Sequence, residues 1–192
     1  VYRHMDIGSA KIRPEEMLGV PHHLVDCLEP DEEFNVVRFQ QMAKEAMKGI
    51  YDRGRIPVLV GGTGFYIQAV TGDIDFTVHG EDTTYRQMLE EKAKTEGAQV
   101  LHEMLAAVDP ASAAAIHANN VKRVIRALEY YRQTGKPISQ HNEEQRQKES
   151  PYNLAYFVLN DERTRLYERI DARIDQMLAD GLIDEVKTLK KM

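Results

Sequence analysis

The sequence predicts an α/β protein whose parallel sheet core is interrupted by a helical insertion. Two continuous apolar runs, residues 56–60 and 154–159, have the composition of strands buried on both faces. Helical patterns flank both runs, and the chain between them has the pattern of one helix after another. We therefore expect residues 1–76 and 151–192 to form the two parts of the core, and residues 77–150 to form the insertion.

Composition and charge limit the kinds of partner. The chain has 192 residues, which allows one domain or one domain with a sizeable insertion. It carries 25 basic and 31 acidic side chains, a formal charge of −6, so any anion must be bound by a local group of cations. The one cysteine, Cys27, rules out a disulfide framework. No apolar run approaches the ~18 residues of a membrane span. We expect a cytoplasmic protein with no membrane partner.

The first part of the core begins with loops and continues into a helix. Glycines and prolines break residues 1–33, which predicts mostly loop. Apolar residues at three- and four-residue spacing between Phe39 and Ile50 then predict an amphipathic helix, which a following glycine ends. The strand expected at 56–60 comes next and leads through a glycine turn into a short helix at 65–70.

The insertion is predicted to be helical up to residues 140–150, a polar stretch without an apolar stripe that we expect to be a connection. Asp109 is an expected N-cap, with Pro110 at the first helical position. After the second strand, a helix is expected from Asp161 to Asp180, where a glycine ends it. The insertion helices are expected at residues 83–96, 98–108, from 109 onward, and from 119 or 120 to 135.

Three arginines on the helix expected from Asp161 to Asp180 form the strongest charge signal in the sequence. Arg165, Arg169 and Arg173 stack one turn apart, and like charges at this spacing repel by roughly 0.2–0.5 kcal/mol per pair. No carboxylate lies three or four residues from Arg169 or Arg173. Negative charge is therefore expected from a tertiary Asp or Glu, from solvent, or from a phosphate or diphosphate that guanidinium groups bind in a bidentate way. The apolar stripe expected to face the core consists of Leu166, Ile170, Ile174, Met177 and Leu178.

A second basic group opens the helix that closes the insertion. Lys122, Arg123 and Arg126 lie in its first turns, and residues 120–136 hold five positive side chains against Glu129 alone. This local excess of +4 in a chain of −6 indicates a polyanionic partner such as a nucleic acid, although a solvated helix face would have the same pattern. Cations at a helix N-terminus oppose the macrodipole, which favours a functional reason.

The glycine turn at residues 61–64 follows the first predicted strand. Ligands of open α/β sheets bind at this edge, where Thr63 and the backbone N–H groups would face them. Capping of the next helix would explain Thr63 equally well. His22 and His23, with Asp26 and Cys27 nearby, match no zinc spacing, so no metal ligands are assigned.

Five motifs in order resemble the tRNA dimethylallyltransferase family, also called tRNA isopentenyltransferases. The resemblance implies a P-loop-kinase-like parallel sheet core with a helical insertion domain. It also implies transfer of a dimethylallyl group from dimethylallyl diphosphate to the exocyclic N6 amine of the adenine just 3′ of the anticodon, with release of diphosphate. The implied partners are the tRNA anticodon stem-loop, the donor and Mg²⁺, and we expect a monomer. The motifs are residues 1–11, 19–26, 57–68, 122–129, and 166–173 with 181–185.

The resemblance also shows which family elements these residues lack. Family members carry a P-loop of the GPTASGKT type, and then an Asp-Ser-x-Gln motif just before the counterpart of Val1. The aspartate of that motif is the family's general base, and the P-loop binds the donor's diphosphate. We therefore expect this chain to correspond to the middle of the enzyme and to be inactive by itself.

The matching positions imply roles for individual side chains. Thr63 matches a position at the acceptor adenine, and Arg173 matches the arginine that grips the diphosphate, with Arg169 beside it. Lys122, Arg123 and Arg126 match a tRNA-contacting Gln-Arg-x-x-Arg segment in which lysine replaces glutamine, and Arg86 matches another tRNA contact. Three alternatives remain open: an adenylate isopentenyltransferase, a P-loop nucleotide kinase, and an RNA-binding helical module.

Overall fold

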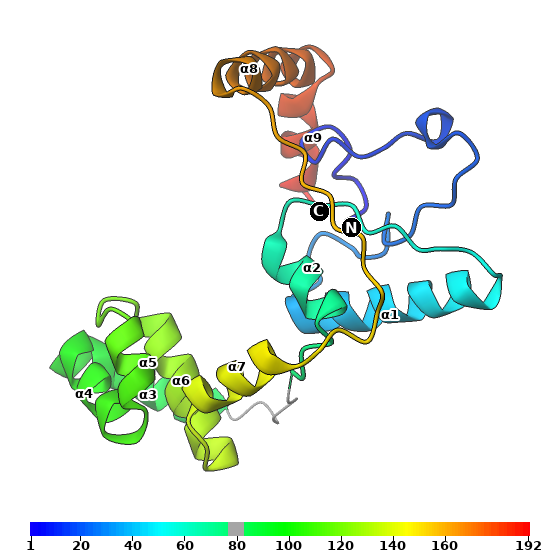
Figure 1. Ribbon diagram of the computed structural model, residues 1–192. Coiled ribbons are helices and arrows are strands. Elements are labelled where there is room, and N and C mark those ends of the chain that lie inside the picture. Colours follow the sequence, from blue (N-terminus) through cyan, green and yellow to red (C-terminus); the bar gives the residue numbers. More distant parts are fainter. Residues whose placement is uncertain (77–82) are drawn as a thin grey trace. The chain divides into compact units, whose positions relative to one another are not determined.

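The protein is seen in a computed structural model that describes residues 1–76 and 83–192 (Figure 1). The chain divides into two compact units. Unit 1 comprises Val1–Val70 and Asn153–Met192, and unit 2 comprises Thr71–Tyr152. The expected domain boundaries, and the RNA-binding role expected for the insertion at residues 77–150, stay predictions.

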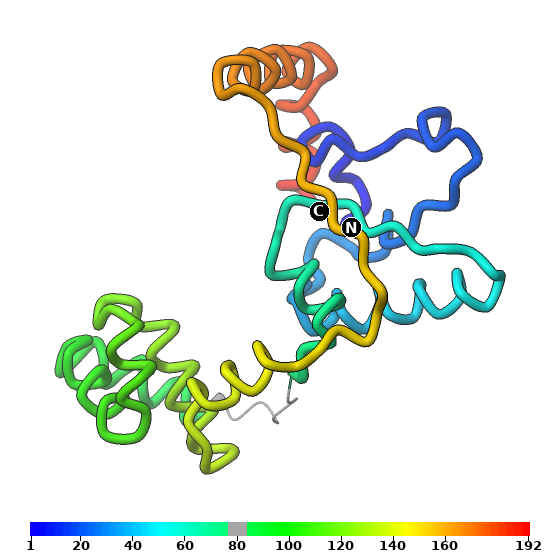
Figure 2. The backbone as a smooth tube through the Cα atoms, in the orientation of Figure 1, coloured from blue at the N-terminus to red at the C-terminus, as the bar shows by residue number. Residues whose placement is uncertain are grey.

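The predicted P-loop-kinase-like parallel sheet core is wrong for the described residues. These contain helices but no strand, and their β-pairing is limited to an isolated parallel bridge between Tyr2 and Leu28. Residues 56–60 and 154–159 are open, uncoiled stretches (Figure 2), and most of their apolar side chains are exposed, Val60 at 92% and Leu159 at 97%. The apolar pattern indicated burial, but a strand also needs a neighbour for its backbone N–H and C=O groups, which the pattern cannot supply.

Unit 1 positions the glycine turn through its first two long helices. The Asn35 side chain caps α1 by accepting from the N–H groups of Val37 and Arg38 at 3.1 and 3.0 Å. Buried Gln40 on α1 donates to the carbonyl of Ala69 on α2 at 2.6 Å. The helical elements of this unit are η1 (Pro14–Met17), α1 (Val36–Asp52), α2 (Gly64–Thr71, whose last residue belongs to unit 2), α8 (Arg163–Ala179) and α9 (Leu182–Leu189).

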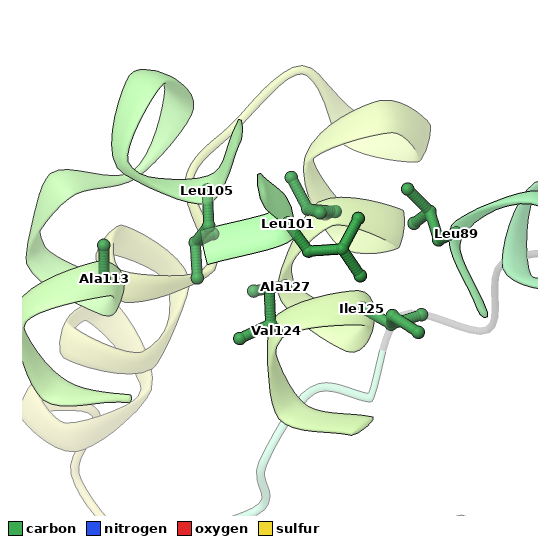
Figure 3. Packing of buried hydrophobic residues seen from close by; sticks show 8 residues of the cluster. Leu89, Leu101, Leu105, Ala113, Val124, Ile125 and Ala127 are labelled. Carbon is green, nitrogen blue, oxygen red and sulfur yellow. The ribbon is translucent and has the colours of Figure 1, made fainter. Parts of the chain in front are cut away.

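Unit 2 is a helical bundle with an apolar core, and its helices up to residue 134 occur where the sequence predicted them. Leu89, Leu101, Leu105 and Val124 have 0% exposure and come from three different helices (Figure 3). The helices are α3 (Thr83–Glu96), α4 (Ala98–Val108), α5 (Pro110–Ala115), α6 (Val121–Thr134) and α7 (Ile138–Gln147).

Helix α7 replaces the connection expected at residues 140–150, so that prediction is wrong. The helix buries no residue, which explains why a search for an apolar stripe misses it. Its first turn is held by Asp109, which accepts from the N–H of Ser139 at 3.0 Å and from its hydroxyl at 2.6 Å. Asp109 also caps α5, accepting from the N–H of Ser112 at 3.0 Å. One buried carboxylate therefore joins two helix N-termini.

Candidate functional site

The arginine stack on α8 divides into paired and unpaired members. Arg165 Nε lies 4.0 Å from Glu162 Oε2, and Arg169 Nη1 lies 3.6 Å from Asp161 Oδ2. Arg173 makes no ion pair with any residue that the structure describes. The acidic partners, Asp161 and Glu162, lie just before the first residue of α8. Neither of them is three or four residues from Arg169 or Arg173, the spacings at which the sequence showed no carboxylate.

Arg173 is exposed, so its guanidinium group is accessible to a ligand. The pairs made by Arg169 and Arg165 are themselves solvent-exposed, and such pairs contribute ~0–1 kcal/mol, so an anion could displace them. The expected core stripe of α8 is not buried in the described residues, since Leu166, Ile170, Ile174 and Leu178 are 37–49% exposed. Helix α8 therefore presents both apolar and cationic side chains to solvent.

Thr63 stands immediately before α2, and its backbone carbonyl accepts from the N–H groups of Tyr66 and Ile67 at 3.0 and 3.3 Å. Its side chain is exposed, and its hydroxyl makes no hydrogen bond within the described ranges. Capping therefore does not occupy this hydroxyl. The Tyr66 ring lies 5.0 Å from that of Phe39 on α1, centroid to centroid, which fixes the helix that follows the turn.

Helix α6 has a buried apolar face and an exposed basic one. Val124, Ile125 and Leu128 pack in the unit 2 core, while Lys122, Arg123 and Arg126 are exposed. These three cations form no ion pair with the residues described. We refer to Lys122, Arg123 and Arg126 as the α6 basic face.

Glu129, the one carboxylate near the α6 basic face, is committed to another partner. Arg86 on α3 donates to both of its oxygens, from Nε at 2.9 Å and from Nη2 at 3.1 Å. The Glu129 side chain is 5% exposed, so this bidentate pair compensates a buried charge. Arg132 Cζ lies 4.1 Å above the Tyr85 ring and joins the same two helices. Arg86 thus has a structural partner, and its expected RNA contact stays a prediction.

The predicted site residues are divided between the two units. Thr63, Arg169 and Arg173 belong to unit 1, whereas Arg86 and the α6 basic face belong to unit 2. The described residues contain no group of three or more His, Cys, Asp or Glu side chains that could hold a metal ion. In the same part of the chain, no helix is long and apolar enough to cross a membrane.

Sequence reasoning overlooked Glu185, the residue with the most unusual polar contacts of unit 1. Its carboxylate accepts hydrogen bonds from three consecutive backbone N–H groups far away in the sequence. A weak signal was present, because Asp184 and Glu185 occupy the first turn of a short helix after a glycine, where acidic side chains are common. That signal does not identify the distant partner.

Comparisons with known proteins agree over the whole chain. The sequence model of the family described as IPP transferase matches residues 1–192. A tRNA dimethylallyltransferase from Lachnoclostridium phytofermentans is 64% identical over 191 residues, covering 100% of this chain and 61% of the relative. Another tRNA dimethylallyltransferase, from Carboxydothermus hydrogenoformans, is 49% identical over 192 residues, with 100% and 62% covered. The chain therefore spans about three fifths of the length of these relatives.

Solved structures give the same result. A full-length tRNA isopentenylpyrophosphate transferase from Bacillus halodurans is 48% identical and superposes with a TM-score of 0.63. The alignment covers 100% of this chain and 58% of the other. A eukaryotic dimethylallyltransferase, solved acting on tRNA, is 30% identical and superposes with a TM-score of 0.80. The alignment covers 96% of this chain and 46% of the other.

Proposed function

This chain belongs to the IPP transferase family, and from that premise we propose that the whole protein is a tRNA dimethylallyltransferase. It would move a dimethylallyl group from dimethylallyl diphosphate to the N6 amine of the adenine just 3′ of the anticodon, with release of diphosphate. The observation that carries the proposal is Arg173, which lacks a carboxylate partner among the described residues although the other two arginines of its stack have one.

The first part of the reaction concerns the leaving group. As the allylic carbon–oxygen bond breaks, its electron pair goes to the diphosphate oxygen, and negative charge grows there. A guanidinium held in place before the reaction stabilises that charge with little reorganisation. Arg173 would supply this group, and Arg169 a second one when the diphosphate competes with Asp161. Mg²⁺ would be a counter-ion of the diphosphate, since this ion is commonly held by substrate phosphates.

The second part concerns the acceptor. A carbon–nitrogen bond forms between the allylic carbon and N6, and the amine loses a proton to a base. The adenine must leave the stacked anticodon loop to reach the donor, as it does in other enzymes that modify bases. Thr63 has an exposed hydroxyl without a partner in the described part of the chain, which suits a contact to the flipped base.

The α6 basic face would bind the phosphates of the stem-loop. Phosphate neutralisation releases counterions, and this term supplies much of the affinity for nucleic acids. Lys122, Arg123 and Arg126 are available for that purpose because the nearby carboxylate of Glu129 is bound to Arg86. An RNA contact by Arg86 would be made in addition to its bidentate pair with Glu129.

The test mixes the protein at its full natural length with labelled dimethylallyl diphosphate and either an anticodon stem-loop or AMP. Prenylated stem-loop supports the proposal, and prenylated AMP identifies an adenylate isopentenyltransferase. Phosphoryl transfer from ATP to a nucleotide would identify a kinase, and RNA binding without any transfer would identify an RNA-binding module. Light scattering on the same sample tests the proposed monomer, and cell fractionation tests the cytoplasmic location.

A further inference from the structure

The Glu185 carboxylate holds the N-terminal segment of unit 1. Its Oε2 accepts from the backbone N–H groups of Asp6 and Ile7, both at 2.7 Å, and its Oε1 accepts from that of Gly8 at 2.9 Å. The partners are 177–179 residues apart in the sequence. Three successive backbone donors thus converge on one side chain at the start of α9.

The surroundings of this carboxylate favour its charged form. Partial burial alone would raise the pKa of Glu185, but the N–H donors of Gly8, Ile7 and Asp6 outweigh it, with help from the Lys11 charge. The pKa therefore lies below its ordinary value, and Glu185 is ionised at neutral pH. Hydrogen bonds to charged groups are stronger than neutral ones.

The two segments also pack closely at residue 8. A Cβ atom added to Gly8 would lie 3.0 Å from Leu182 Cδ1 and 3.4 Å from Glu185 Oε1. The Leu182 and Glu185 side chains would have to shift by a few tenths of an ångström. A weaker tie lies nearby, where Arg13 Nη2 is 3.8 Å from Asp180 Oδ2.

Helix α9 is joined to α8 by a tight corner, so holding one helix orients the other. Helix α8 ends at Ala179, and Gly181 makes the corner with a φ of +102°. Arg173 is six residues before that end, which is less than two helical turns. The hydrogen bonds that Glu185 accepts therefore help to set the orientation of α8 relative to the N-terminal segment.

We propose that Glu185 is a positioning residue for the transfer reaction: by binding the backbone of residues 6–8 it fixes the α8–α9 corner, and so directs Arg173 toward the donor's diphosphate. This inference rests on the proposed function. It assigns to Glu185 no contact with either substrate. Removal of its carboxylate should therefore affect donor binding through Arg173 and leave RNA binding by the α6 basic face unchanged.

The experiment uses the full-length protein and compares E185A, E185Q and G8A with the control D184N. Asp184 is adjacent on the same helical turn, but its side chain is 82% exposed, and Lys187 is its one side-chain partner among the described residues. We expect E185A to raise the KM for dimethylallyl diphosphate about tenfold and G8A to raise it by a smaller factor, while the Kd for the stem-loop and the KM of D184N stay at wild-type values. The donor KM of E185Q should lie between those of the wild type and E185A. The amide oxygen of the substituted side chain can accept from Asp6 and Ile7, but its NH₂ group faces the N–H of Gly8 and cannot accept from it.

A double-mutant cycle separates positioning from a general structural effect. Donor binding is measured by calorimetry for R173A and for R173A with E185A. If Glu185 acts through Arg173, its removal should change donor affinity less than twofold once Arg173 is gone. Multiplicative effects in the cycle, or equal losses for donor and RNA, would overturn the inference.

Two further outcomes distinguish the role of Glu185 from a folding defect and from failure of the proposed function. If E185A does not fold, G8A and E185Q decide the matter by the same measurements. Absence of transfer by the wild-type protein would refute the proposed function. Wild-type transfer with an unchanged donor KM in E185A and G8A refutes only the role of Glu185.

Discussion

The two units respond differently to the same kind of sequence pattern. In unit 2 the apolar stripes of the helices are buried, with Leu101 and Val124 at 0% exposure. In unit 1 the apolar runs that predicted strands are exposed, with Leu159 at 97%. A helix satisfies its own backbone and needs only an apolar neighbour, whereas a strand needs a specific partner for every second backbone group. The apolar pattern is therefore sufficient to predict the helices that build the core of unit 2, but not whether the apolar runs of unit 1 pair as strands.

The largest effect expected from this contrast is on stability. Leu101→Ala should lower the free energy of unfolding of unit 2 by about 2–5 kcal/mol, because it leaves a cavity in the cluster shown in Figure 3. Leu159→Ala in the same 192-residue chain should cost less than about 0.5 kcal/mol, because its side chain is exposed already. Urea denaturation measures both. A cost for Leu159→Ala as large as that for Leu101→Ala would mean that the contrast between the units is false.

The site could be predicted from the sequence only where local charge patterns were informative. The arginine stack and the basic start of α6 are visible because their spacing on a helix is fixed by the helix itself. The pairing of Arg86 with Glu129 depends on tertiary structure, whereas Asp161 pairs with Arg169 eight residues away at the start of α8, outside the three- and four-residue spacings that the pattern considers. Glu185 was overlooked for the same reason, since its donors are backbone groups that have no signature in the sequence.

The next effect concerns the chemistry assigned to unit 1. In the full-length protein, Arg173→Ala should lower kcat/KM for the donor about 10²–10³-fold, the loss typical of removing one donor to a developing anion. The Kd for the anticodon stem-loop should stay near wild type, because Arg173 is not part of the α6 basic face. Arg165→Ala is the matched control, since Arg165 lies in the same stack but has Glu162 as a neighbour. Equal effects of the two variants on donor use would remove the distinction between paired and unpaired arginines.

A smaller effect is expected from the carboxylate that joins α5 and α7 in unit 2. Burial would raise the pKa of Asp109, but the donors of Ser139 and Ser112 outweigh it and lower the pKa below the ordinary 3.8. A carboxyl group with a lowered pKa in the folded state stabilises the fold above its unfolded pKa, and this contribution is lost as the pH falls. The stability of unit 2 should therefore decrease below about pH 3.8, and Asp109→Asn should cost about 1–3 kcal/mol at pH 7.

Thermal unfolding between pH 2 and pH 7 measures this effect. The difference in stability between the wild-type protein and Asp109→Asn should narrow as the pH falls, since protonation removes the charge from Asp109 as the substitution does. Glu103→Gln is a suitable control, because Glu103 lies on the exposed side of α4 in the same unit. A difference that stayed constant over the whole pH range would show that the charge on Asp109 is not what holds the two helices.

The smallest effect is the one that defines unit 2 as the RNA-binding region. Lys122→Ala with Arg126→Ala should weaken binding of the stem-loop and reduce the slope of log K against log salt by roughly 0.7–0.9 for each phosphate that is no longer neutralised. Donor KM should not change, because neither residue belongs to unit 1. Lys94→Ala is the matched control, since Lys94 is an exposed cation of the same unit that lies 3.8 Å from Glu91. If the double variant bound the donor poorly and kept the wild-type salt slope, the division of roles between the two units would be reversed, and the basic face of α6 would have to contact the donor.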